Sequence, residues 1–194
     1  VNCVISLENL SSSIWTWYKD GDKWAVKKVI EIPAEPASED DFSDVAAAVG
    51  AHGATKLYNV GDLGGSLPGV PVASALAAQI EGGNKPDAIL FPQSYDGRDI
   101  AGRLSAKLNV GVLTNLVGLT DDGQSEHAIF GGATIVKAKL TNDAPHIFVV
   151  RPKSFAPEES GGGAPAVEAI SAPDAGATNA AKIKQKHVEA HSGP

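Results

Sequence analysis

Residues 91–106 read Phe91-Pro-Gln-Ser-Tyr95-Asp96-Gly97-Arg98-Asp99-Ile100-Ala-Gly-Arg103-Leu-Ser-Ala. The apolar run at 88–91 predicts a buried strand, and the pattern of residues 99–108 predicts a helix. A strand, a short polar elbow and a helix start are where open α/β sheets usually present their functional groups. The elbow at residues 95–99 is therefore the first candidate site.

From Phe42 onward, helices and strands alternate along the chain. Helices are predicted over residues 44–49, 72–80 and 99–108, and strands over 56–60, 88–91 and 110–114. Gly82-Gly83 predicts the end of the second helix. After residue 114 only strands are predicted, over 128–130, 133–140 and 146–150, with Asn142-Asp143 as the hairpin turn between the last two. The predicted fold class is α/β, a nucleotide-binding-like three-layer domain with a mostly parallel sheet flanked by helices and a C-terminal run of strands.

The two ends of the chain differ from this central part, which gives three regions. Residues 1–37 hold all three tryptophans and predict a β-hairpin, with strands at 14–18 and 23–32 around the turn dipeptide Asp20-Gly21. Residues 42–157 form the α/β domain. Residues 158–180 have the Gly, Ala, Pro and Ser composition of a linker, and a short basic helix is predicted over 180–191.

Bulk properties narrow the classes of function. A formal net charge of -7 argues against a nucleic-acid partner, because little positive charge is available to pair with phosphates. No apolar run approaches the roughly 20 residues that cross a bilayer, and no secretory signal peptide is visible. The single cysteine, Cys3, excludes an internal disulfide and fits a reducing compartment. We therefore expect a cytoplasmic protein that is not embedded in a membrane.

The elbow holds Tyr95, Asp96, Gly97, Arg98 and Asp99. Gly97 suits a tight turn or a close backbone approach. Asp99 could cap the helix, while Arg98 could reach Asp96 or a partner chain. No pair of nucleophile and base is evident, so a structural or interface role is favoured over catalysis, and no catalytic residue is assigned.

Other motifs give no stronger signal for chemistry. The glycine-rich loop at residues 61–69 could cradle a phosphate, but it lacks both the dinucleotide-binding spacing and the P-loop lysine, so a simple loop is favoured. The five histidines lack metal-ligand spacing, and His187 and His191 suit a solvated helix face. Ser94 has no nucleophile elbow around it. The residues alone indicate an α/β module without its own active site.

A family resemblance covers the chain from about Phe42 to Pro194. The segments that carry it are Asp44-Val-Ala-Ala-Ala-Val-Gly-Ala-His-Gly-Ala-Thr55, Ser94-Tyr-Asp-Gly-Arg-Asp-Ile-Ala-Gly-Arg-Leu-Ser-Ala-Lys-Leu108, Ile129-Phe-Gly-Gly-Ala-Thr-Ile-Val-Lys-Ala-Lys139 and Arg151-Pro-Lys-Ser-Phe155. This part resembles the N-terminal domain of the electron transfer flavoprotein alpha subunit.

The resemblance implies a subunit of an FAD-containing heterodimer. Such proteins pair with an electron transfer flavoprotein beta subunit and take electrons from acyl-CoA-type dehydrogenases, as in fatty acid beta-oxidation, to a quinone oxidoreductase. In the family, the FAD-binding domain follows the segment equivalent to residues 192–194, so no FAD contact and no metal ligand is assigned here. The alternative is a non-redox fusion or fragment that acts as an interaction module without flavin.

The first 37 residues carry a second resemblance. Residues 12–36 are similar to one hairpin of the selenium-binding protein (methanethiol oxidase) family, whose ligand histidines are absent here. The chain is therefore interpreted as a mosaic with a joint near residues 37–41. Such a joint would remove an early strand and helix, which exposes apolar faces and an unpaired sheet edge. The hairpin could cover that edge, or it could remain undocked and leave the domain marginally stable or prone to aggregation.

Overall fold

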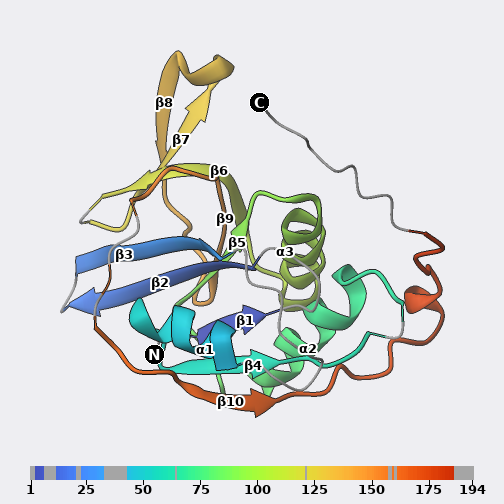
Figure 1. Cartoon of the computed structure of the whole chain (residues 1–194). Coiled ribbons are helices and arrows are strands. Elements are labelled where there is room, and N and C mark those ends of the chain that lie inside the picture. The colour runs from blue at the N-terminus through green and yellow to red at the C-terminus, as the bar shows by residue number, and fades with distance from the viewer. Residues whose placement is uncertain are drawn as a thin grey trace, which may run out of the picture.

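The computed structural model describes residues 3–6, 12–20, 23–32, 43–63, 65–120, 122–156, 159 and 161–185, and before residue 33 it describes the backbone alone. The strands are β1 (Cys3–Ser6), β2 (Ser12–Asp20), β3 (Lys23–Ile32), β4 (Lys56–Asn59), β5 (Ala88–Pro92), β6 (Val112–Leu119), β7 (Ser125–Ile129), β8 (Thr134–Ala138), β9 (His146–Val150) and β10 (Ala166–Ala169) (Figure 1). The helices are α1 (Ser43–Ala51), α2 (Gly69–Glu81) and α3 (Tyr95–Leu108), with short 3-10 turns η1 (Phe130–Gly132) and η2 (Gly176–Asn179).

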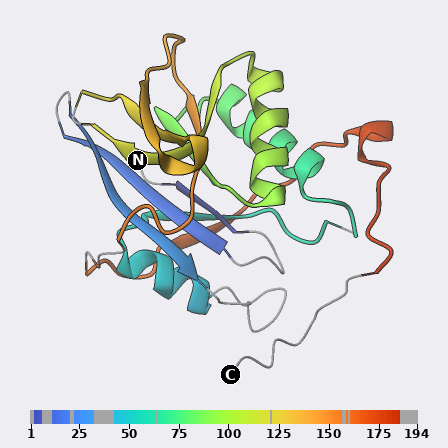
Figure 2. The ribbon, with the colours of Figure 1, turned by 90° about the horizontal axis from the view of Figure 1, so that it is seen from above.

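The elements form layers. Figure 2 shows α2 and α3 on one side of strands β1, β4 and β10, with α1 on the other side. The largest hydrophobic cluster lies between α2, α3, β5 and β9, and another joins α1 to β4. The alanines of α2 favour a helix and let α3 approach closely. The predicted α/β class, with helices flanking a mostly parallel sheet, is confirmed.

Strand β4 lies at the centre of a parallel three-stranded sheet with the order β1-β4-β10. Cys3 of β1 and Ala166 of β10 both stand opposite Lys56. A strand before the predicted joint and a strand from the predicted linker therefore lie on the two sides of β4.

A second sheet has the order β5-β9-β6-β7-β8. Strand β9 is inserted between β5 and β6 and is parallel to both, while β7 and β8 are antiparallel. The predicted hairpin turn at Asn142-Asp143 is wrong, because β8 and β9 are not neighbours. The strand predicted at 110–114 begins at Val112 and runs on to Leu119.

The N-terminal hairpin is confirmed in its backbone. Strands β2 and β3 pair antiparallel from Ser12 opposite Ile32 to Asp20 opposite Lys23, with a register shift between Thr16 and Trp17. Strand β2 passes close to β1 and β5, so the hairpin lies between the two larger sheets (Figure 1). The turn residue Gly21 lies outside the described residues.

The C-terminal segment is more ordered than its composition indicates. Residues 166–169 form β10, and Ile170 is buried against Tyr58, Val60 and Ala75. The backbone N–H of Ile170 donates to the carbonyl oxygen of Asn59 at 2.8 Å. The basic helix predicted over 180–191 is wrong for residues 180–185, which are not helical, and residues 186–191 lie outside the described residues.

The lengths of the described helices bear on whether the chain could cross a membrane. Among the described helices, none combines the length and the apolar character that a bilayer crossing requires.

Candidate functional site

Helix α3 begins at Tyr95, four residues before the predicted start. The Oγ of Ser94 accepts a hydrogen bond from the backbone N–H of Gly97 at 3.0 Å, which makes Ser94 the N-cap. The interpretation of Asp99 as the cap is therefore wrong. Residues 95–99 form the first turn of the helix, and their exposure follows helical spacing, with Gly97 buried and Tyr95 87% exposed.

Gly97 is a close-contact residue. A Cβ atom built at this position would lie 2.1 Å from the carbonyl oxygen of Pro92. Of the two roles open for Gly97, the structure shows close backbone approach rather than a tight turn, since its φ is not in the left-handed region. The glycine lets α3 fold back directly onto the end of β5.

The charged side chains of this turn are engaged with one another. The guanidinium of Arg98 lies 5.1 Å from the centre of the Tyr95 ring, and its Nε donates to the Ser94 carbonyl oxygen at 3.3 Å. Arg98 therefore does not pair with Asp96. Asp99 forms an ion pair with Arg103 one turn later, at 2.9 Å.

The Asp99 carboxylate also faces the start of α2. A Cβ atom at Gly69 would lie 1.8 Å from Asp99 Oδ2, so the carboxylate would have to move to admit a larger residue there. Asp99 thus contributes to the packing of α2 against α3. This arrangement supports a structural role for Asp99 and leaves Tyr95, Asp96 and Arg98 as the outward members of the stretch.

The glycine-rich loop between β4 and α2 is joined to the C-terminal segment. The Nζ of Lys182 donates to Ser66 Oγ, and the backbone N–H of Ile183 donates to the Gly65 carbonyl oxygen at 2.9 Å. At the loop start, the Gly61 N–H donates to Asn59 Oδ1 at 2.7 Å. These bonds agree with the interpretation of a simple loop rather than a phosphate cradle.

A buried polar network joins three strands at the base of the β7–β8 hairpin. His127 is 7% exposed; its Nδ1 lies 2.6 Å from the Thr114 carbonyl oxygen, and its Nε2 lies 2.7 Å from Ser125 Oγ. Ser125 Oγ in turn lies 3.0 Å from the Ala138 carbonyl oxygen. Because Thr114 O can only accept, Nδ1 carries a proton. The network fixes β6, β7 and β8 to one another.

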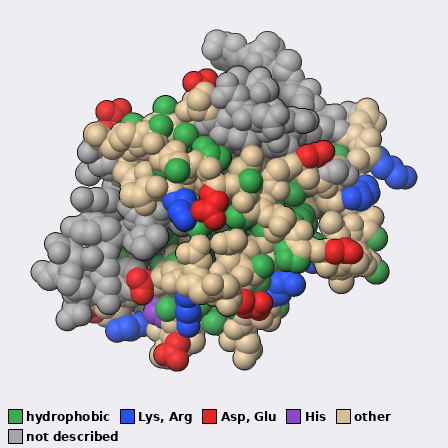
Figure 3. Space-filling model, turned by 90° about the horizontal axis from the view of Figure 1, so that it is seen from below, with side chains coloured by type: hydrophobic (Ala, Val, Ile, Leu, Met, Phe, Trp, Pro, Cys, Tyr) green, Lys and Arg blue, Asp and Glu red, His purple; other side chains and the backbone are tan. Residues whose placement is uncertain are grey.

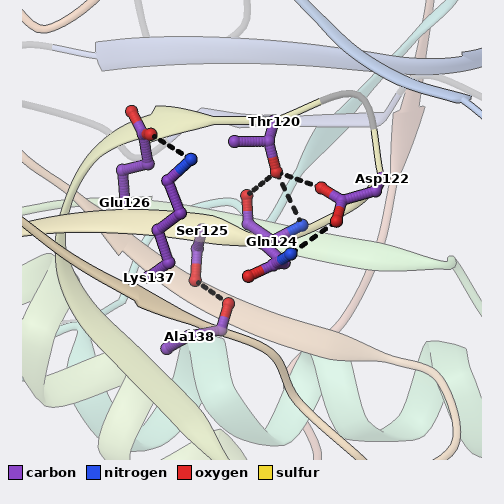
Figure 4. Close-up of polar contacts among 7 residues, drawn as sticks. All are labelled: Thr120, Asp122, Gln124, Ser125, Glu126, Lys137 and Ala138. Atoms are coloured by element: carbon purple, nitrogen blue, oxygen red, sulfur yellow. Dashed lines mark hydrogen bonds and ion pairs between the residues drawn. The ribbon is translucent and has the colours of Figure 1, made fainter.

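The turn between β6 and β7 is held by side chains (Figure 4). The hydroxyl of Thr120 contacts Asp122 Oδ1 and the Gln124 carbonyl oxygen, and accepts from the Gln124 backbone N–H at 3.1 Å. The Gln124 side-chain amide donates to the other oxygen of Asp122. Figure 4 also shows Glu126 paired across the strands with Lys137, at 3.4 Å.

This turn predicts a pH dependence. The hydrogen bonds from Thr120 and then Gln124 lower the pKa of Asp122 from 3.8 to about 2. A pKa lowered in the folded state means that the ionised carboxylate stabilises the fold above about pH 4, and that this contribution is lost as the pH falls from 3.8 towards 2. The difference in unfolding free energy between the wild type and Asp122→Asn, measured in urea, should be constant above pH 5 and shrink at pH 2.5. A difference that stays unchanged at pH 2.5 contradicts this assignment.

A flavin dinucleotide carries a pyrophosphate, which requires free N–H groups or cations at its binding site. At the start of α3, the Gly97 N–H is already bonded to Ser94, and Asp96 and Asp99 add negative charge. Gln93 Oε1, buried at the same edge, is an unpartnered acceptor among the described residues and does not complement an anion. The start of α3 therefore does not offer a site for a pyrophosphate group.

The remaining surface features do not suggest another ligand. A depression lined by residues of the α2 and α3 C-terminal ends and the segment 142–145 lies at the amino ends of β5 and β9, whereas ligands of α/β sheets bind at the carboxyl ends. Within the described ranges, no three His, Cys, Asp or Glu side chains come together as a metal site. On the face seen in Figure 3, acidic and basic side chains are scattered among apolar ones.

Sequence reasoning missed the exposed tip of the β7–β8 hairpin. A strand was predicted through residue 130, but Phe130 lies in the turn η1 and is 83% exposed. The signal was present in Gly131-Gly132, since short glycine-containing segments between two β-prone runs predict hairpin turns.

Comparisons with known proteins give a consistent picture. Residues 27–175 match the family model described as electron transfer flavoprotein domain. The chain is 34% identical over 132 residues to the electron transfer flavoprotein subunit alpha of Mycobacterium leprae, covering 68% of this chain and 40% of that protein. It is 37% identical over 100 residues to the subunit alpha of Mycobacterium tuberculosis (strain CDC 1551 / Oshkosh), covering 51% of this chain and 31% of that protein. It is 32% identical over 106 residues to the subunit alpha of Syntrophomonas wolfei, covering 52% of this chain and 32% of that protein.

Two facts about coverage follow from these matches. The chain spans well under half of the length of these relatives, 40% at most. The family match begins at residue 27, within β3, and so extends across the expected joint at 37–41.

Proposed function

The chain belongs to the electron transfer flavoprotein domain family, and from this we propose that it forms the N-terminal domain of an alpha subunit, with a structural and partner-docking role. The observation that carries the proposal is the family match over residues 27–175, together with relatives that are all alpha subunits. The α/β fold and the close packing of α3 against the end of β5 support it.

In this proposal, the chemistry belongs to the complete heterodimer. FAD, held by the beta subunit and by the part of the relatives that this chain does not span, accepts electrons from acyl-CoA-type dehydrogenases and passes them to a quinone oxidoreductase. The chain itself acts as an electron-carrier subunit and not as an enzyme, in the cytoplasm. The stacked pair Tyr95 and Arg98, with Asp96 beside it, is proposed as one contact with a protein partner.

The proposal predicts how the chain behaves towards flavin. The chain alone should not bind FAD tightly, because its strand–helix turn offers carboxylates and occupied N–H groups where a pyrophosphate would lie. Titrating FAD with purified chain should leave the flavin fluorescence unchanged at micromolar concentrations, whereas co-purification with a beta subunit that carries flavin absorbance is expected. Stoichiometric tight binding of FAD by the chain alone would overturn this division of roles, and failure to co-purify would favour a non-redox interaction module.

A further inference from the structure

The buried histidine at the base of the β7–β8 hairpin belongs to a chain of three polar contacts. His127 Nδ1 lies 2.6 Å from the Thr114 carbonyl oxygen, and Nε2 lies 2.7 Å from Ser125 Oγ. Ser125 Oγ lies 3.0 Å from the Ala138 carbonyl oxygen, a contact that Figure 4 shows. The chain of contacts therefore joins β6, β7 and β8 and ends on a backbone carbonyl oxygen at both ends.

The number of protons available to these contacts depends on the charge of the ring. A carbonyl oxygen can only accept a hydrogen bond, so Nδ1 and the Ser125 hydroxyl must donate at the two ends. The hydroxyl has a single proton, and once it points to Ala138 the middle contact needs a proton on Nε2. A neutral ring that is protonated on Nδ1 has no proton there. All three contacts are hydrogen bonds only when His127 is an imidazolium.

With a neutral ring, the Ser125 hydroxyl faces two acceptors and can satisfy one of them. Lone pairs on Nε2 and Oγ would face each other at 2.7 Å, so the hydroxyl proton turns towards His127. The Ala138 carbonyl oxygen then loses its bond from Ser125. These two residues stand directly opposite each other in the register of β7 and β8, and Ser125 is 0% exposed. The lost bond is thus a buried link between the two strands of the hairpin.

The charged groups of the surrounding strands do not oppose a second proton on the ring. Glu126 and Lys137 pair with each other at 3.4 Å and lie on the other face of β7 and β8, since successive residues of a strand alternate faces. Strand β6 has no ionisable residue, and the neighbouring β9 has His146 at its first position. Strand β3, which also contacts β6, contains three lysines and one glutamate, Lys23, Lys27, Lys28 and Glu31. Hydrogen bonds to oxygen acceptors favour the charged form of the ring.

We propose that His127 and Ser125 form a proton-operated clasp between β6, β7 and β8. With both ring protons present, three hydrogen bonds close the clasp. When Nε2 loses its proton, the Ser125 hydroxyl turns to the ring and the bond to Ala138 opens. A bond that needs a bound proton is present at low pH and is lost as the pH rises. The hairpin projects from the body of the molecule (Figure 1), so the order of a protruding element depends on pH.

NMR of the imidazole nitrogens in the full, 15N-labelled chain tests the proton count directly. Spectra at about pH 5 and pH 8 bracket the range in which histidines ordinarily titrate. We expect the His127 ring to carry protons on both nitrogens at the lower pH and on Nδ1 alone at the higher pH, with His127→Gln identifying its signals. A ring that never holds two protons in the folded chain, or whose neutral form is protonated on Nε2, would overturn the inference.

Hydrogen–deuterium exchange measures the effect on the hairpin. After correction for the intrinsic pH dependence of exchange, the protection of residues 136–139 should fall by about threefold or more from pH 5 to pH 8, as expected for the loss of one modest hydrogen bond. Ser125→Ala removes the hydroxyl and should abolish this difference. The matched control is His146→Gln, because His146 also contacts a backbone carbonyl oxygen but lies on β9, which does not pair with β7 or β8.

The outcomes of the exchange experiment separate the clasp from other sources of pH dependence. The inference predicts that His146→Gln keeps the wild-type difference and that Ser125→Ala loses it. A difference that persists in Ser125→Ala, or that disappears in His146→Gln, would overturn the inference. Its failure would leave the proposed function untouched, because the clasp rests on the contacts of β6, β7 and β8 alone.

Discussion

Replacing Gly97 by alanine should destabilise the domain by about 3 kcal/mol, within the range seen for forced overpacking. The new Cβ atom would lie 2.1 Å from the Pro92 carbonyl oxygen, a distance that real Cβ atoms do not tolerate. The obstacle is backbone rather than a flexible side chain, so α3 must move away from β5. That movement would open the cluster in which Ile100 and Leu104 pack against β9.

The matched control is Gly102→Ala on the same helix. A Cβ atom at Gly102 meets nothing within 4 Å, and the position is exposed. Alanine there should stabilise the domain by about 0.5–1 kcal/mol, because it lowers the conformational entropy of the unfolded chain and favours the helix. Urea unfolding of the two variants should give shifts of opposite sign. Equal shifts would show that the contact between Gly97 and Pro92 does not constrain α3.

The second large effect is expected at Ile170, which follows β10. Ile170→Ala should cost about 2–4 kcal/mol, because the side chain is buried against Tyr58, Val60 and Ala75 and its removal leaves a cavity. Val167→Ala in β10 is the control, since Val167 is 44% exposed and surface changes usually stay within about 0.5 kcal/mol.

Chemical denaturation of these two variants also tests whether the C-terminal segment is part of the domain. If residues 158–180 were a free linker, both substitutions would leave the midpoint unchanged. A neutral Ile170→Ala would therefore contradict the docking of this segment along β4.

Local sequence patterns correctly predicted the strands whose residue types match their position in the folded sheets. The segments predicted as strands at residues 56–60, 88–91 and 146–150 form β4, β5 and β9, which carry buried apolar residues. Strand β10 was missed because Ala166–Ala169 has all four residues exposed and weak strand propensity; pairing with β4 defines it. The insertion of β9 between β5 and β6 was also missed, since strand order depends on tertiary contacts that no local pattern records.

At the candidate site too, local sequence predicted some features, while others depend on tertiary contacts. The stretch at residues 95–99 was identified from the sequence, but it was interpreted as an elbow before the helix, in which Gly97 suits a tight turn or a close backbone approach. Only the approach of Pro92 explains the glycine, and that contact is tertiary. Phe130 was assigned to a strand, and its exposure follows from a left-handed turn that sequence alone does not specify.

The central claim is that this chain is a docking domain that pairs with a beta subunit. Hydrogen–deuterium exchange of the chain, free and with saturating beta subunit, tests it most directly. We predict that the start of α3 around Tyr95 and Arg98, proposed as a contact with a protein partner, becomes protected in the complex. Exchange that is the same with and without the beta subunit throughout the described residues would contradict the claim.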